Sequence, residues 1–309
     1  MMAGRVISHL WFLEFSNIKN IGGFSMTKFK NVLVLCVTLV TISLGIKAQV
    51  IEGATPRDGF YDKIWIEEKR PIPLAYVREA DILWSKRVWQ IIDLRERINH
   101  PLYFPNTTLD DRQSLMQVLM ASINEGSIRA FQDDEFTLPY TPEEIRNQYA
   151  RQEVRTFVRP DPPYDEYDST ITIPLSSDEV VKFRIKEEWF FDAKRSVLDV
   201  RILGVAPVRE RIDPTTRESL GDQTLFWVYF PEARNVLVNA EVFNRNNDAQ
   251  RVSYDDLFLR RMFNSYIYKE SNVYDRQIQD YYQNGLDQLL EAENIKNVIR
   301  NFELDIWEY

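Results

Sequence analysis

The sequence predicts an α+β protein in two halves, in which antiparallel strands pack against helices and the C-terminal region is helical. Two apolar or alternating runs, 180–191 and 196–208, flank the polar sequence DAKR, which predicts a β hairpin. The aromatic run TLFWVYF at 224–230 predicts a third strand. Between 274 and 306 the apolar residues recur at a period of about 3.6 residues, which predicts helix.

The N-terminal segment has the layout of a secretory signal. After Met26, two lysines precede an apolar run of roughly 15 residues, 32–46, and the sequence KAQ follows it. This run is shorter than the ~20 residues that span a bilayer as a helix. We therefore predict a signal peptide at 26–48 with cleavage after Ala48, and an uncleaved anchor is the alternative. Residues 1–25 fit the layout badly and are predicted to be a non-translated or mis-assigned leader.

Cysteine usage and charge exclude several classes of function for the mature chain. Cys36, the only cysteine, lies inside the apolar run, so cleavage leaves no disulfide, thiol nucleophile or thiolate metal site. Cleavage also removes five basic residues and one acidic residue, which changes the net charge from −9 to −13. A chain this acidic repels phosphate backbones and anionic lipid. We therefore expect no nucleic-acid partner and no direct membrane span.

The first part of the mature chain is expected to be an extended N-terminal arm at 49–74, because proline and glycine punctuate it. The arm carries large apolar side chains that need a surface, either on their own domain or on a neighbouring subunit: Phe60, Tyr61 and Trp65.

The first half follows at 75–131 and is predicted to contain two helices. Residues 75–98 have apolar positions near a helical period. Residues 112–125 carry one apolar stripe, which Gly126 ends. The expected caps of this second helix are Asp110 or Asp111.

A linker and the second half complete the chain. Residues 132–175 are rich in proline and acidic residues and are predicted to be a linker, interrupted by a short helix near 142–152. The second half spans 176–309 and contains the predicted strands. Within it, the sequence SYDD at 253–256 is expected to cap a helix that runs to about residue 269.

The two halves echo each other in sequence order. Residues 91–95 (IIDLR) match 197–201 (VLDVR), and the tripeptide YFP occurs at 103–105 and again at 229–231. If these matches reflect an internal duplication, residues 80–95 form a strand hairpin like the one predicted in the second half, and not a helix. Chance matches are the alternative, so helix and hairpin both stay open for this segment.

The residues that carry most enzyme chemistry are sparse in the mature chain. His100 is its only histidine and is expected to be a loop residue, because no second imidazole or cysteine accompanies it. Glycine loops for phosphate and the G-x-S-x-G sequence are absent, and the acidic run at 133–135 lacks the spacing of a calcium loop. Carboxylate pairs such as Glu187 with Glu188 point to opposite faces of a strand. We therefore expect no catalytic residue, metal or cofactor.

Aromatic residues beside charge form the candidate site. Trp, Tyr and Arg carry much of the binding energy at protein interfaces. Trp189 and Trp227 lie on predicted strands and are expected to fill the core. The candidate protein-interface residues are aromatic residues of the two chain ends and of the segment 75–98: Phe60, Tyr61, Trp65, Trp84, Trp89, Trp307 and Tyr309.

Several long, non-repetitive strings make the mature chain resemble the GldN family, called PorN in related organisms. They are ADILWSKRVW at 80–89 with IDLR at 92–95, KEEWFFD at 186–192, FPEAR at 230–234, NAEVFNR at 239–245, RMF at 261–263 with YIYKESN at 266–272, and DIWEY at 305–309.

The resemblance implies a non-enzymatic structural subunit of the type IX secretion and gliding motility machinery. It implies a periplasmic ring formed with the outer-membrane lipoprotein GldK, which associates the subunit with the outer membrane, and contact with the motor proteins GldL and GldM. It carries over no catalytic residues and no residue-level ring contacts. The residues alone leave two alternatives open: a periplasmic carbohydrate-active hydrolase that uses a carboxylate pair, and a binding protein for a small ligand.

Overall fold

The structure, a computed structural model, describes residues 68–108, 112–158, 160, 166–213, 218–244, 247 and 249–307. They all belong to the unit Lys63–Tyr309, and the unit Met1–Asp62 lies outside them. The strands are β1 (Ile82–Asp93), β2 (Ala130–Phe131), β3 (Pro139–Tyr140), β4 (Arg151–Val158), β5 (Glu166–Ile173), β6 (Val180–Asp192), β7 (Val197–Ile212), β8 (Ser219–Thr224), β9 (Trp227–Tyr229), β10 (Glu241–Val242), β11 (Val252–Ser253) and β12 (Tyr266–Glu270). The helices are η1 (Glu79–Asp81), α3 (His100–Tyr103), α4 (Leu115–Glu125), α5 (Pro142–Tyr149), η2 (Ser177–Glu179), α6 (Phe230–Leu237), α7 (Tyr254–Leu259), η3 (Ile278–Asp280) and α8 (Gly285–Trp307).

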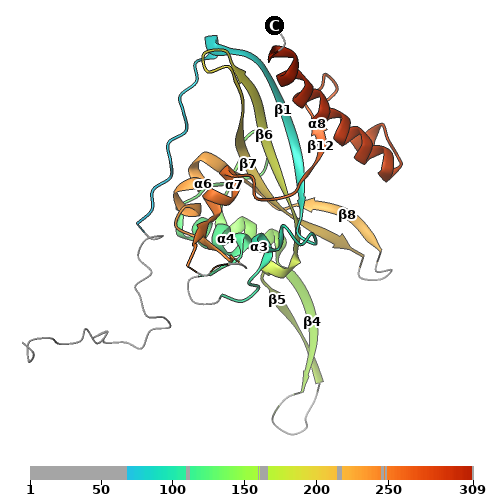
Figure 1. Ribbon diagram of the computed structural model, residues 1–309. Helices are drawn as coiled ribbons and strands as arrows, with labels where there is room; N and C mark the ends of the chain where they lie inside the picture. The colour runs from blue at the N-terminus through green and yellow to red at the C-terminus, as the bar shows by residue number, and fades with distance from the viewer. Residues whose placement is uncertain are drawn as a thin grey trace, which may run out of the picture. The chain divides into compact units, whose positions relative to one another are not determined.

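An eight-stranded sheet organises these elements (Figure 1). Its order is β12-β1-β6-β7-β9-β2-β3, and β8 pairs with β7 beside this path. Each of its strand pairs is antiparallel. Helices pack on the sheet, and α8 ends the described chain, so the predicted α+β class with a helical C-terminal region is confirmed.

β6 and β7 form the hairpin that the sequence predicts. In its turn, the Asp192 carboxylate accepts the backbone N–H groups of Lys194 at 2.9 Å and Arg195 at 3.3 Å. Gly204 lies in β7 where the Phe136 ring leaves no room for a side chain, since a β-carbon there would lie 2.6 Å from the ring. The predicted third strand is divided, because β8 ends at residue 224 and α6 begins at residue 230.

The helix predicted at 75–98 is wrong, because this segment contains η1 and the 12-residue strand β1. β1 is one strand and not a hairpin: it pairs with β6 on one side and with β12 on the other. Residues 88–92 are buried on both faces, which requires consecutive apolar or hydrogen-bonded side chains. A run of consecutive apolar residues also matches a helical period. The strand partners lie some 100 and 180 positions away in the sequence, so local periodicity does not indicate them.

The second predicted helix is confirmed as α4, with a different cap. The Ser114 hydroxyl accepts the Gln117 N–H at 3.4 Å, and the Gln117 side chain accepts the Ser114 N–H at 3.0 Å. Gly126 ends the helix with a φ of 78°, as predicted. The expected caps Asp110 and Asp111 lie outside the described residues.

Residues 132–175, expected to be a linker with a short helix, also contain a β hairpin. The short helix is α5, which Thr141 caps. β4 and β5 follow it and pair over their full length, from Arg151 opposite Ile173 to Val158 opposite Glu166. None of the prolines that suggested a linker lies within β4 or β5: three stand between the two strands in the sequence, and the others precede β4 or follow β5. They therefore do not interrupt the pairing.

The helix that Ser253 caps is shorter than predicted. The Ser253 hydroxyl accepts a hydrogen bond from the Asp256 N–H at 3.3 Å and so caps α7. This helix ends at residue 259, well before the predicted end at residue 269. The remaining residues of this segment include β12, which forms the edge of the sheet beside β1. The sheet hydrogen bonds with β1 override the local helical pattern.

The two YFP tripeptides occupy different structures. Residues 103–105 span the end of α3, whereas 229–231 join β9 to α6. Residues 91–95 include the end of β1, whereas 197–201 begin β7. These segments therefore give no structural support to an internal duplication.

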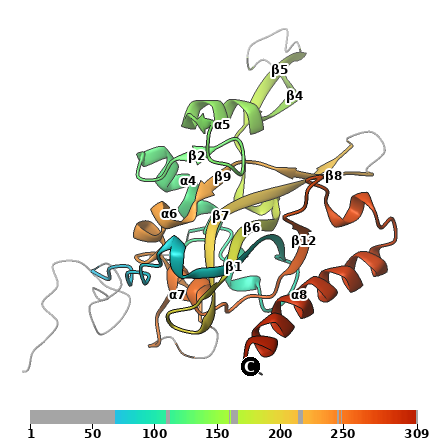
Figure 2. The same ribbon diagram turned by 90° about the horizontal axis from the view of Figure 1, so that it is seen from above.

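One face of the sheet carries two hydrophobic clusters. The larger includes Ile92 and Phe183 and lies against α3, α4, α6 and α7. The smaller joins Val88 and Ile267 to the inner face of α8 through Ala292, Ile295 and Ile299. Figures 1 and 2 show α8 beside β12, apart from the other helices. The opposite face carries a third cluster around Trp89 and Trp227, as expected for Trp227.

Candidate protein-interaction surfaces

Two of the predicted interface residues are packed within the fold. The Trp84 ring stacks on Phe302 of α8 with 4.6 Å between ring centroids. Trp89 is buried, and its Nε1 donates a hydrogen bond to Asp134 Oδ2 at 2.9 Å. The Lys269 ammonium lies 4.5 Å from the centroid of the Trp89 ring. These two tryptophans therefore stabilise this chain internally.

The other predicted interface residues are not placed by the structure. Phe60, Tyr61, Trp65 and Tyr309 lie outside the described residues. The backbone of Trp307 ends α8. Their role at an interface stays a prediction.

A strap, residues 68–78, runs from the α6–α7 region to the turn of the β6–β7 hairpin (Figure 1). Polar side chains of the body hold its backbone: Arg234 Nη2 donates to the Ile72 carbonyl at 2.7 Å, and Arg201 Nη2 donates to the Ala75 carbonyl at 3.1 Å. Lys69 forms an ion pair with Asp256. Meanwhile Ile72 and Tyr76 face outward, and Tyr76 is 89% exposed. The strap thus presents apolar side chains on a backbone that polar contacts hold in place.

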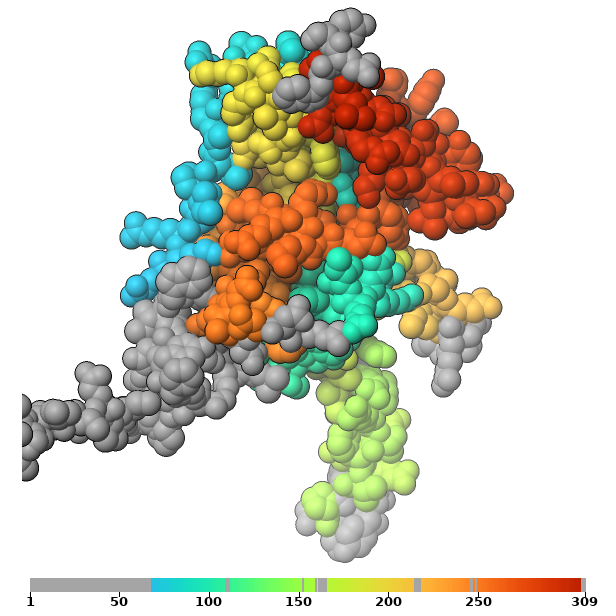
Figure 3. All heavy atoms as spheres, in the orientation of Figure 1, coloured from blue at the N-terminus to red at the C-terminus, as the bar shows by residue number. Residues whose placement is uncertain are grey.

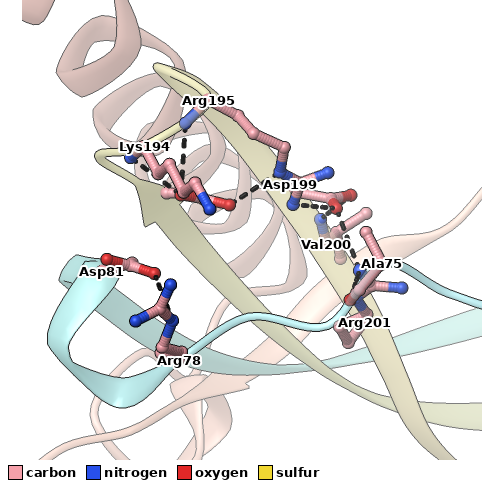
Figure 4. Close-up of polar contacts among 9 residues, drawn as sticks. Ala75, Arg78, Asp81, Lys194, Arg195, Asp199, Val200 and Arg201 are labelled. Atoms are coloured by element: carbon pink, nitrogen blue, oxygen red, sulfur yellow. Dashed lines mark hydrogen bonds and ion pairs between the residues drawn. The ribbon is translucent and has the colours of Figure 1, made fainter.

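A chain of charged contacts connects this strap to the hairpin turn (Figure 4). Asp192 Oδ2 accepts from Arg195 Nε at 2.6 Å, and Arg195 Nη2 lies 3.4 Å from Asp199 Oδ2. The same oxygen of Asp199 lies 3.4 Å from Arg201 Nη2, the nitrogen that donates to Ala75. One continuous series of polar contacts therefore joins the strap to the turn.

We expect acid to weaken this turn. The Arg195 hydrogen bond holds the pKa of the Asp192 carboxyl below its usual range. A carboxyl with a lowered folded-state pKa stabilises the fold above its unfolded pKa of about 3.9, and this contribution is lost as the pH falls through the folded value. Asp192→Asn should therefore reduce the difference in unfolding free energy between pH 7 and pH 3, measured by urea denaturation. An unchanged difference would contradict the prediction.

The outer face of α8 is apolar over its first turns. Leu286, Leu289 and Leu290 are exposed, Leu286 to 63%, although the opposite face of the helix is buried on the sheet. Tyr281 and Tyr282, just before the helix, are also exposed, and their ring centroids lie 5.0 Å apart. Exposed leucine and tyrosine in one place are typical of a protein-binding surface.

The β4–β5 hairpin is a third candidate surface. Figure 3 shows it projecting from the described body. Its two strands form a sheet of their own. Its exposed side chains include four large apolar or aromatic ones, Val154, Phe157, Val158 and Tyr167.

Comparison with protein-family models identifies one match, to "Gliding motility associated protein GldN", over residues 77–308. The match includes every strand and helix that the structure describes, from η1 to α8, and covers most of the chain. The chain belongs to the GldN family. This membership associates it with gliding motility and type IX secretion, and confirms the resemblance seen in the sequence. A search of curated proteins gives no match.

Three carboxylates of this GldN-family chain, all on its described elements, have structural partners. Glu187 is fully buried and paired with Arg261 at 2.7 Å, while Glu188, on the opposite face of β6, lies 3.7 Å from Arg87. Asp255 pairs with Arg234 at 2.7 Å. In the described part of the chain, no group of three or more His, Cys, Asp and Glu side chains is placed to hold a metal ion.

The remaining sequence candidates are also structural. His100 is the first residue of α3 and not a loop residue, and its ring packs edge-on against Phe104 at 5.7 Å. Asp133, in the acidic run, accepts the Thr137 hydroxyl at 2.6 Å and the Leu138 N–H at 3.0 Å. None of the helices among the described residues is long and apolar enough to cross a bilayer.

Most of the exposed apolar surface was not predicted from the sequence. Leu286, Leu289 and Leu290 lie in the run 274–306 whose periodicity predicts a helix, but periodicity does not say which of the apolar residues face the core. For Tyr76 and the hairpin residue Tyr167, the available signal is weak: each tyrosine stands among charged residues or prolines, a context in which exposure is plausible. Burial by distant strands decides each of these cases.

Proposed function

We propose that the chain is a non-catalytic structural subunit of a periplasmic ring complex, formed with a GldK-type outer-membrane lipoprotein and required for type IX secretion and gliding motility. Family membership is the observation that carries this proposal. The signal peptide predicted at 26–48 supports a periplasmic location, and the lipoprotein would tie the subunit to the outer membrane.

The exposed surfaces support a subunit with several neighbours. The strap, the outer face of α8 and the β4–β5 hairpin are separate surfaces, and each carries large apolar side chains. A ring subunit needs at least two contacts with copies of itself and further contacts with its partners. We assign the remaining contacts to the lipoprotein and to GldL-type and GldM-type motor proteins, with Phe60, Tyr61, Trp65, Trp307 and Tyr309 as further candidate residues.

The two alternatives gain no specific support. A glycoside hydrolase needs two carboxyl groups facing each other across a cleft, ~5–9.5 Å apart. Glu187 and Glu188 instead lie on opposite faces of β6 and pair with different arginines, and Asp255 pairs with Arg234. The cleft of about 780 Å³ beside β12 is lined by polar and apolar side chains, and nothing in its lining specifies a small ligand.

Co-expression tests the proposal. The tagged mature chain is produced with a GldK-type lipoprotein, purified in detergent, and analysed by size-exclusion chromatography and electron microscopy. We expect both proteins to elute together in a very large, ring-shaped assembly. In cells, deletion of the gene should abolish both gliding and secretion, and the wild-type gene should restore them. A mature chain that stays monomeric in the presence of the lipoprotein would contradict the proposal.

A further inference from the structure

The strap displays an apolar segment that is held in place before it binds anything. All residues from Ile72 to Tyr76 are exposed, and each of them is apolar or aromatic. Arginine side chains of the body hold the backbone of this run through the carbonyl groups of Ile72 and Ala75. A segment that is ordered in advance loses little conformational entropy on binding. The strap therefore has the properties of a preformed ligand for an apolar surface.

The start of α8 offers an apolar surface of similar length. Leu286, Leu289 and Leu290 lie on one face of the helix, because they are three and four positions apart, and each is more than half exposed. The two exposed tyrosines just before the helix extend this surface. The helix rises about 10 Å from Leu286 to residue 293, and the exposed run of the strap extends about 16 Å. The strap can therefore lie along the leucines and reach the tyrosines.

This part of the chain is also acidic. Residues 280–293 contain four acidic residues and no basic one, and none of the four forms an ion pair within the described structure. Glu293 is exposed and lies three positions after Leu290, so it continues the face that carries the leucines. Opposite charges on two contacting surfaces favour their association. A partner of this face should therefore combine apolar side chains with a basic group.

The strap provides such a basic group. It contains three basic residues and one acidic residue, a net charge of +2. Lys69 already forms an ion pair with Asp256. Arg78 lies 3.7 Å from Asp81 of η1. Arg70 is exposed and has no acidic partner among the described residues, so its charge is available to a carboxylate of another molecule.

We infer that the strap of one copy binds the outer face of α8 of a second copy, with Arg70 opposite Glu293. Figures 1 and 2 show the strap and α8 on opposite sides of the sheet, so the α8 that the strap contacts belongs to another molecule. Because the two contacting patches differ, the contact is heterologous and can repeat from copy to copy around a closed ring. The inference rests on the proposed function in that copies of the chain must be neighbours.

Cysteine cross-linking tests this contact, because Cys36 is the only native cysteine and lies in the predicted signal peptide. Two single-cysteine variants, Tyr76→Cys and Leu286→Cys, are made in a Cys36→Ser background and mixed in the presence of the lipoprotein. After oxidation, we expect a disulfide-linked dimer that neither variant forms by itself, and a chain with both cysteines should give a ladder of linked oligomers. Arg70→Glu in the Tyr76→Cys chain should lower the yield of dimer at least about tenfold, and Glu293→Arg in the Leu286→Cys chain should restore it.

Asn301→Cys serves as the matched control, because Asn301 is also exposed on α8 but lies about 22 Å along the helix from Leu286. Arg78→Glu is the control for the charge reversal and should change the yield less than about twofold, because we place Arg70 and not Arg78 at the acidic face. Circular dichroism checks that every variant is folded.

Two results would overturn the inference. One is that Tyr76→Cys cross-links no more with Leu286→Cys than with Asn301→Cys. The other is that Arg70→Glu prevents co-purification of the lipoprotein, which would make the lipoprotein the partner of the strap. If the first result accompanies an intact large assembly, the proposed function stands and only this contact is rejected. Loss of all assembly in the unmodified chain would reject the proposed function.

Discussion

Arg261→Met is expected to lower the free energy of unfolding by about 3–5 kcal/mol, because it leaves a buried carboxylate without its counter-charge. That carboxylate is Glu187, which is 0% exposed and accepts hydrogen bonds from Arg261 Nη1 at 2.7 Å and Nη2 at 3.3 Å. Gln90 and Trp189 also donate to it, at 2.7 and 3.1 Å. These two donors are neutral, so the charge itself is balanced by Arg261. Urea unfolding at pH 7 measures the effect.

The neighbouring residue provides a matched control for this prediction. Glu188→Gln removes a carboxylate from the same strand that lies 3.7 Å from Arg87 and is partly exposed, so we expect a change within ~1 kcal/mol. The double variant Glu187→Leu with Arg261→Met removes both charges and should recover part of the lost stability. If Arg261→Met costs no more than Glu188→Gln, Glu187 does not depend on this ion pair.

This pair also has a place in the architecture. Val88 and Ile92, on either side of Gln90, belong to the two different hydrophobic clusters of one sheet face. The polar group around Glu187 therefore lies between the cluster under α8 and the cluster under the other helices. We expect Arg261→Met to loosen α8 first, because the smaller cluster has fewer buried side chains to hold it. Hydrogen exchange along α8 reports this loosening.

Asp255→Ala is expected to cost a similar amount, about 3–5 kcal/mol, because Arg234 then becomes a buried, unpaired cation. Both side chains are nearly fully buried, and they are joined by two hydrogen bonds of 2.7 and 3.1 Å. Arg234 Nη2 also donates to the Ile72 carbonyl, so its displacement should release the strap. We expect trypsin to cut after Arg78 several-fold faster than in the wild type, alongside a lower melting temperature.

Glu232→Ala is the control for the second prediction. Glu232 lies on the same helix, α6, and pairs at 3.0 Å with Arg129, which is exposed, so its loss should change stability by less than ~1 kcal/mol. The strap should remain as resistant to trypsin as in the wild type. If Asp255→Ala lowers the melting temperature but leaves strap cleavage unchanged, Arg234 does not hold the strap.

Local sequence signals were sufficient for some elements of the fold. Gly126 ends α4 and Ser253 caps α7 because the required hydrogen bonds and backbone angles involve residues only a few positions apart. The β6–β7 hairpin could be predicted for the same reason, since its turn is local. These predictions depend on neighbours in the chain and therefore survive without knowledge of the fold.

The candidate site was less predictable. Trp84 and Trp89 were predicted as interface residues because tryptophan is common at interfaces, but Trp84 is partly buried against Phe302 and Trp89 is buried beside Asp134. Conversely, Tyr76, Tyr167 and Leu286 are exposed because nothing distant in the chain covers them in the described structure. Whether an aromatic side chain is covered depends on packing partners, and residue type alone does not report those partners.

By itself, the sequence determined the family, the predicted export signal and the elements whose stop or turn residues are local. Only the tertiary structure decided that residues 82–93 are a strand, because β6 and β12 supply its hydrogen bonds from distant positions. It also decided that Glu187 and Asp255 are ion-paired inside the fold, and that the β4–β5 hairpin stands without a third strand. The reason is the same in each case: long-range pairing and burial are properties of the assembled chain, and a short window of residues does not contain them.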